Sequence, residues 1–158
     1  MHAFISSRLD YCNGLYTTLS RSSLSRLQLV QNTAARILTN TPRRSHITPV
    51  LMGLHWLPIK ARIDFKILLI TFKALHGLAP VYILDLLPPK QNKPALRSSD
   101  KGLLEVPATN LKTKGDRAFA AVAPTLWNAL PLPLKNAVSV ERFKSMLKTH
   151  LFRQHFVI

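Results

Sequence analysis

The sequence of residues 58–77 is PIKARIDFKILLITFKALHG. Proline suits the first position of a helix and glycine suits the position after its end, so this stretch predicts a helix over about 58–76. Its apolar residues form two stripes on opposite sides, separated by narrow polar seams. One stripe is Ile59, Ile63, Ile67, Ile70 and Ala74, and the other is Phe65, Leu68, Leu69, Phe72 and Leu75. A helix that is apolar on two sides is expected to lie between other elements.

Apolar residues three or four positions apart predict further helices before and after this one. They cover about 3–19, 23–39, a short segment from Pro49, 81–87, a segment after Asp116 that Pro124 must kink or split, and about 139–155. Ser139 is expected to cap the last helix, and the serines at 20–23 supply a turn and a cap for the second.

The helix predicted over 23–39 has one broad apolar arc, the kind of face that packs inward. The arc contains Leu24, Leu27, Val30, Ala34, Ala35, Ile37 and Leu38, and the residues outside it are Gln28, Asn32, Thr33 and Arg36.

These patterns predict a mainly α fold, an irregular bundle of about five to seven helices. Residues 102–114 permit a small β-hairpin, with Leu103, Leu104 and Val106 before Pro107 and Leu111 after it. The predicted division is a helical subdomain at 1–87, a loop or linker at 88–114 and a C-terminal helical segment at 115–158, which could pack with 1–87 as one domain.

The charge is strongly unbalanced. The chain has 22 lysines and arginines against 7 aspartates and glutamates, a formal charge of +15, and Asp10 is the single carboxylate before Asp64. A protein this basic repels itself, which favours a polyanionic partner, RNA or DNA. Metal-dependent phosphoryl transfer needs converging carboxylates, and this chain has no Asp-Asp pair.

Other catalytic and cofactor signatures are also missing from the sequence. The five glycines form no phosphate-binding or dinucleotide loop, and one cysteine excludes an internal disulfide and a multi-cysteine zinc site. Cys12 could in principle act as a nucleophile beside a histidine, but on the apolar face of a helix it is expected to pack as a small hydrophobe. We therefore expect no enzyme activity, no cofactor and no metal.

The candidate nucleic-acid-binding residues are basic side chains in three places. They are Arg43 and Arg44 in a turn, Arg62, Lys66 and Lys73 on one seam of the helix at 58–76, and Lys112, Lys114 and Arg117 further on. If about five of them neutralise phosphates, the logarithm of the affinity should fall with the logarithm of salt at a slope of about −4 to −5 on duplex DNA. Trp56 and Trp127 could stack on bases, but both lie in apolar runs and are expected in the core.

Short motifs along nearly the whole chain carry a resemblance to a known family. They are Leu9-Asp10-Tyr11-Cys12-Asn13, Leu27-Gln28-Leu29-Val30-Gln31-Asn32, Ala34-Ala35-Arg36, His55-Trp56-Leu57-Pro58, Arg62-Ile63-Asp64-Phe65-Lys66, Lys73-Ala74-Leu75-His76-Gly77, Leu96-Arg97-Ser98-Ser99, Gly115-Asp116-Arg117-Ala118-Phe119 and Leu126-Trp127-Asn128-Ala129-Leu130-Pro131. The chain resembles the C-terminal region, downstream of the polymerase palm, of reverse-transcriptase proteins from LINE-type, jockey-like non-LTR retrotransposons.

The resemblance implies a helical, basic segment that helps to hold RNA and target DNA, with the rest of a reverse-transcriptase protein as a further partner. Neither the endonuclease nor the Asp-Asp polymerase centre of that family is present, so no catalytic residue is carried over. The implied identity is a non-catalytic remnant located in the cytoplasm or nucleus.

Three alternatives stay open. The chain could be a structural fragment whose helix at 58–76 packs against a missing polymerase. It could also be an enzyme fragment that still polymerises, or a basic host protein with a mitochondrial presequence containing Arg8, Arg21 and Arg26. No stretch approaches the roughly 20 apolar residues of a membrane-spanning helix.

Overall fold

A computed structural model describes residues 2–90, 102–109 and 115–156. The α-helices in these ranges are α1 (His2–Asp10), α2 (Arg21–Thr39), α3 (Ile47–Gly53), α4 (Ile59–Leu75), α5 (Val81–Leu84), α6 (Phe119–Asn128), α7 (Leu132–Lys135) and α8 (Val140–Phe156). Two 3₁₀ helices, η1 (Asn13–Thr18) and η3 (Gly115–Arg117), accompany them. The mainly α class predicted from the sequence is confirmed. The eight α-helices are one more than the upper end of the predicted range, because residues after Pro131 form a single turn, α7.

The contacts within the chain group into two compact units. Unit 1 contains Met1–Phe65 and Lys148–Ile158, and unit 2 contains Lys66–Leu147. Both unit boundaries fall inside helices, α4 and α8. The division at 88–114 stays a prediction.

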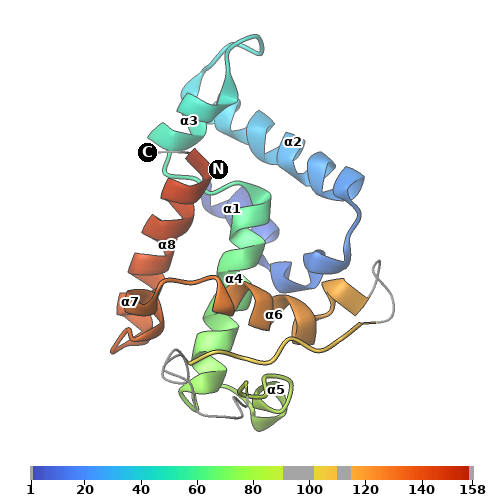
Figure 1. The fold of residues 1–158 in the computed structure, drawn as a ribbon. Helices are drawn as coiled ribbons and strands as arrows, with labels where there is room; N and C mark the ends of the chain where they lie inside the picture. The colour runs from blue at the N-terminus through green and yellow to red at the C-terminus, as the bar shows by residue number, and fades with distance from the viewer. Residues whose placement is uncertain (1, 91–101, 110–114, 157–158) are drawn as a thin grey trace. The chain divides into compact units, whose positions relative to one another are not determined.

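In unit 1, α2 packs against α1 and α3 (Figure 1). The hydroxyl of Ser20 caps α2 by accepting a hydrogen bond from the Ser23 N–H, as the serine-rich turn predicted. Small side chains of α2 let the helices approach closely, because Ala34 and Ala35 are buried with Leu51 and Trp56. The predicted core position of Trp56 is therefore confirmed.

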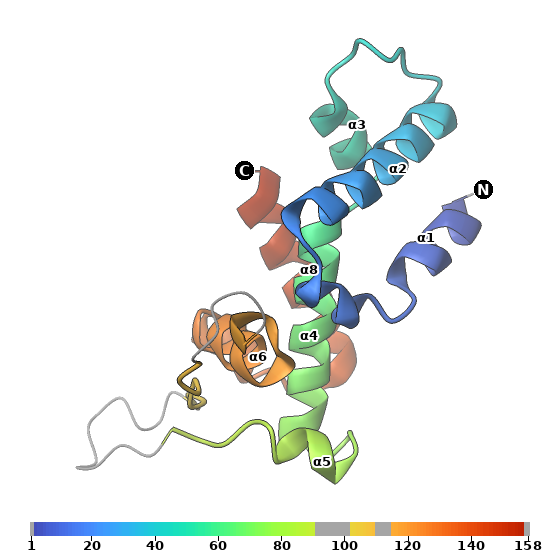
Figure 2. The same cartoon turned by 90° about the vertical axis from the view of Figure 1, so that its right-hand side faces the viewer.

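In unit 2, stacked aromatic rings form the centre of the core. The ring of Phe143 from α8 stacks on Phe72 from α4 at 4.2 Å between centroids, and Trp127 lies 6.2 Å from Phe143. Trp127 belongs to α6, which lies beside the C-terminal half of α4 (Figures 1 and 2). Its predicted core position is also confirmed, since the residue is 3% exposed. Pro124 is buried inside α6 without dividing it.

The helix predicted over 3–19 is shorter in the structure. It ends at Asp10 because Cys12 adopts a left-handed conformation with φ 48°, after which the chain continues as η1. This turn leaves the Cys12 thiol exposed, so the expectation that it packs on an apolar face is wrong. The same turn brings the side chain of Asn13 to a buried position.

The hairpin predicted at 102–114 does not form in its described part, residues 102–109. Leu104 instead makes an isolated antiparallel bridge with Pro89. The side-chain amide of Asn128 satisfies both backbone groups of Leu104: its Oδ1 accepts from the Leu104 N–H at 2.9 Å and its Nδ2 donates to the Leu104 carbonyl at 2.8 Å. Both backbone groups of Leu104 are therefore used by Asn128. Residues 110–114 lie outside the described residues.

Replacing Asn128 by alanine is expected to lower the free energy of unfolding by about 1–2 kcal/mol, because it leaves the buried Leu104 without these two hydrogen bonds. Urea unfolding followed by circular dichroism measures the change. Thr125→Ala, at an exposed position of the same helix, is the matched control and should have little effect. Equal stability of the two variants would contradict the assigned role of Asn128.

Candidate nucleic-acid interface

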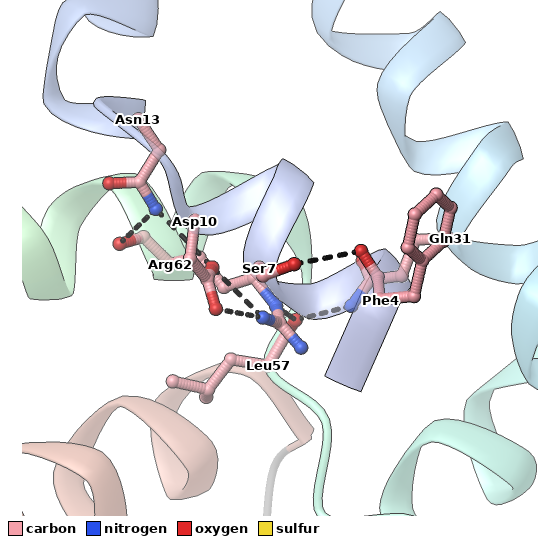
Figure 3. A network of polar contacts seen from close by, with 7 residues as sticks. All are labelled: Phe4, Ser7, Asp10, Asn13, Gln31, Leu57 and Arg62. Atoms are coloured by element: carbon pink, nitrogen blue, oxygen red, sulfur yellow. Dashed lines mark hydrogen bonds and ion pairs between the residues drawn. The ribbon is translucent and has the colours of Figure 1, made fainter. Parts of the chain in front are cut away.

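The structure places the predicted interface residue Arg62 in an internal ion pair. Its Nη1 donates to Asp10 Oδ1 and Oδ2 at 2.9 and 2.8 Å, and its Nε donates to the Leu57 carbonyl at 2.9 Å (Figure 3). Its guanidinium also lies 5.9 Å from the centroid of the Trp56 ring. The Arg62 side chain is 13% exposed, and its positive charge is paired with Asp10 inside unit 1. Arg62 therefore does not belong to the candidate interface.

Two glutamines of α2 complete this polar network. Gln31, which is fully buried, donates from Nε2 to the Leu57 carbonyl at 2.8 Å, and Gln28 Oε1 accepts from the Ile59 N–H at 2.9 Å. Gln28 Nε2 also donates to Gln31 Oε1 at 3.0 Å, which links the two amides. The first N–H groups of a helix need acceptors from outside the helix, and here Gln28 supplies one to α4. The helical wheel placed Gln28 outside the packing arc, and that expectation is wrong.

The sequence contained one signal for this arrangement. The residue before Ile59, where α4 begins, is Pro58, and proline cannot cap a helix as Ser, Thr, Asp or Asn can. A buried helix start without its own capping side chain requires an acceptor from elsewhere in the chain.

The exposed turn between α2 and α3 carries Arg43 and Arg44, as predicted. Asn40 ends α2 in a left-handed conformation, and the Ser45 N–H donates to the Pro42 carbonyl at 3.1 Å. Arg36 stabilises the turn, because its Nη2 donates a hydrogen bond to the Ser45 carbonyl at 3.0 Å. Arg43 and Arg44 are thus exposed on a turn whose backbone is hydrogen-bonded at both ends. The turn is the loop that joins α2 to α3 in Figure 1. The role of Arg36 was not predicted.

The other predicted cations are distributed as follows. Lys66 and Lys73 are partly exposed on α4, and a spacing of seven residues places them on the same side of that helix. Arg117 ends η3 and is partly exposed. Lys112 and Lys114 lie outside the described residues. Arg43 and Arg44 belong to unit 1 and the other three to unit 2, so the two arginines of the turn form a local cluster within unit 1.

Unit 1 has little negative charge to oppose the turn. Its sequence contains ten lysines and arginines but two carboxylates, Asp10 and Asp64. Asp10 is paired with Arg62, and Asp64 is paired with Lys60 one helical turn away. Internal pairing of both carboxylates leaves a surface potential dominated by arginine, which favours anionic ligands.

Two further findings concern the described part of the chain. No group of three or more His, Cys, Asp or Glu side chains in it could hold a metal ion. None of its helices has the length and apolar character needed to cross a bilayer.

Comparisons of the chain with protein-family models, with curated proteins and with solved structures find no match.

Proposed function

We propose that this protein binds the phosphate backbone of RNA or DNA, and that the turn carrying Arg43 and Arg44 is its main contact. The observation that carries the proposal is the presentation of two exposed arginines on a turn held by Arg36, in a unit whose two carboxylates are internally paired. Arginine suits this role because its planar guanidinium can form two hydrogen bonds to one phosphate. Lys66, Lys73, Lys112, Lys114 and Arg117 are proposed as additional contacts.

We further propose that the chain is a non-catalytic remnant of a LINE-type reverse-transcriptase protein that acts in the cytoplasm or nucleus. The places of the motif residues support this. Asp10, Gln28, Gln31, Leu57 and Arg62, which come from four of the motifs that carry the resemblance, take part in one polar network. Trp127 and Asn128, from another motif, hold residues 102–104. Motif residues with such structural roles fit a segment whose motifs maintain the fold and carry no catalytic groups.

The test is fluorescence anisotropy of the purified chain with a labelled single-stranded RNA and a labelled DNA duplex, from about 50 to 200 mM salt. Reversing both charges, Arg43→Glu with Arg44→Glu, is expected to weaken binding about tenfold or more and to make the salt slope shallower by about 2. Both residues are exposed, so the variant should keep its circular dichroism spectrum and its melting temperature.

The matched control is Arg21→Glu with Arg153→Glu, which changes the net charge equally at two exposed positions of the same unit. An equal loss of binding in this control would show that overall charge and not the turn determines affinity. Absence of binding at low salt, or a slope near zero, would remove the binding proposal altogether. Primer extension with Mg²⁺ is expected to give no product.

A second candidate function is that of a structural fragment that packs against another domain. The large apolar side chains of α4, on which this alternative was based, are buried or partly buried. The segment around α5 supports it better, because Leu78, Val81 and Tyr82 are 60%, 74% and 67% exposed. Size-exclusion chromatography and thermal melting of the isolated chain distinguish the two functions: a monomer with a sharp melt argues against the structural fragment.

A further inference from the structure

The side of α2 that faces away from the core carries large aliphatic side chains. Leu29, Val30 and Ile37 are 64%, 55% and 61% exposed. Since successive residues are about 100° apart around the helix axis, these three side chains lie within an arc of about 100°. The opposite side carries the buried Gln31 and Ala35, and Ala34 is buried at the boundary next to Val30. We call Leu29, Val30 and Ile37 the outward face of α2.

The reason for this orientation lies in the contacts of the inward side. The amides of Gln28 and Gln31 must point toward residues 57–59 to bond their backbone groups, and the two alanines allow close packing against α3. Satisfying those contacts turns Val30 and Ile37 toward solvent. Single exposed apolar residues are common, but Val30 and Ile37 are seven residues apart and line up along the helix, with Leu29 beside them. A pair at i and i+7 is one of the spacings by which one amphipathic helix is recognised by another.

The charges beside the outward face indicate what kind of partner fits it. Arg26, one turn before Leu29 and Val30, is exposed on the same side, and Arg43 and Arg44 follow the end of the helix. α2 contains no carboxylate, and the two carboxylates of unit 1 are already paired. A second copy of this chain would therefore bring arginine against arginine, whereas a partner with Asp or Glu beside an apolar seam would be complementary.

We propose that the outward face of α2 docks an acidic amphipathic helix of another protein. The aliphatic side chains pack into the partner's apolar seam, and Arg26 pairs with a carboxylate at its edge. Aliphatic side chains offer no stacking surface to nucleobases, so this site is separate in chemistry from the backbone-binding turn proposed above.

The test uses a synthetic helical peptide with leucine at the a and d positions of its heptads and glutamate at e and g. Binding is measured by isothermal titration calorimetry. The acidic peptide is expected to bind the wild-type chain, and Leu29→Ser with Val30→Ser and Ile37→Ser is expected to weaken binding at least about tenfold. Arg26→Glu is expected to weaken it as well. Two control peptides, one with lysine at e and g and one with serine at a and d, should not bind.

Each contrary result overturns the proposal. Failure of the acidic peptide to bind does so, as does equal binding by the lysine peptide or by the triple serine variant. Binding to phosphatidylserine vesicles that the triple variant loses, with no binding of the peptide, would assign the face to a membrane surface. A dimer in size-exclusion chromatography that the triple variant converts to a monomer would assign it to self-association. Thermal melting of the triple variant should match that of the wild type, because all three side chains are exposed.

Discussion

Arg62→Ala is expected to lower the free energy of unfolding by about 2–4 kcal/mol, because it removes one partner of a largely buried ion pair. The expected loss is smaller than for a fully buried pair, because the Asp10 side chain is 47% exposed. The substitution removes both hydrogen bonds from Nη1 to Asp10, the bond to the Leu57 carbonyl and the packing on Trp56 together. Chemical unfolding with urea measures the loss.

Two controls separate this structural role from a role in binding. Lys66→Ala, four residues further along α4 and partly exposed, should change stability by less than about 0.5 kcal/mol. Asp10→Asn should destabilise less than Arg62→Ala, because Arg62 then keeps its bond to the Leu57 carbonyl. In nucleic-acid binding measured where the variants remain folded, Arg62→Ala should match the wild type. An Arg62→Ala variant of unchanged stability but weakened binding would return Arg62 to the interface.

Gln31→Ala is expected to lower the free energy of unfolding by about 2–4 kcal/mol, the range in which a cavity and lost hydrogen bonds act together. The Gln31 side chain is 0% exposed and bonds both the Leu57 carbonyl and the amide of Gln28. Its removal leaves an empty space and deprives Gln28, which caps α4, of a neighbour that orients it.

Comparison with Gln31→Leu separates the two contributions, because leucine refills most of the volume without restoring the hydrogen bonds. We expect it to cost less than Gln31→Ala but to remain destabilising. Thr33→Ala, at an exposed position of the same helix, is the control and should be close to neutral. A Gln31→Leu variant more stable than the wild type would show that the amide contributes no net stability, and that burying leucine there is better.

One end each of α2, α4 and α8 was predictable from a single residue. Ser20 and Ser139 cap α2 and α8, and Gly77 adopts φ 68° just after α4. These signals act locally, because a capping hydroxyl or a glycine affects the backbone within about one turn. The core positions of Trp56 and Trp127 were also predictable, because a large aromatic ring flanked by apolar residues is usually buried together with them.

The candidate site was predicted in part. Arg43 and Arg44 were placed in an exposed turn from sequence alone, because polar and proline-containing segments between helices lie at the surface. From the sequence, Arg62 looked like another exposed cation, on a polar seam of the helix at 58–76. Its partner Asp10 is 52 residues away, a separation at which no helical periodicity operates. Arg36, which holds the turn, looked like an ordinary surface arginine for a similar reason.

The amino-acid sequence by itself determined the helical class, several helix ends and the excess of positive charge, since each of these follows from composition or from interactions between near neighbours. The tertiary structure decided which side of α2 is buried. A helical wheel shows where the hydrophobic side chains lie but does not show which backbone groups elsewhere need hydrogen-bond partners. The buried backbone groups at residues 57–59 need such partners, and the amides of Gln28 and Gln31 supply them. That requirement turned polar residues inward and left Leu29, Val30 and Ile37 facing solvent.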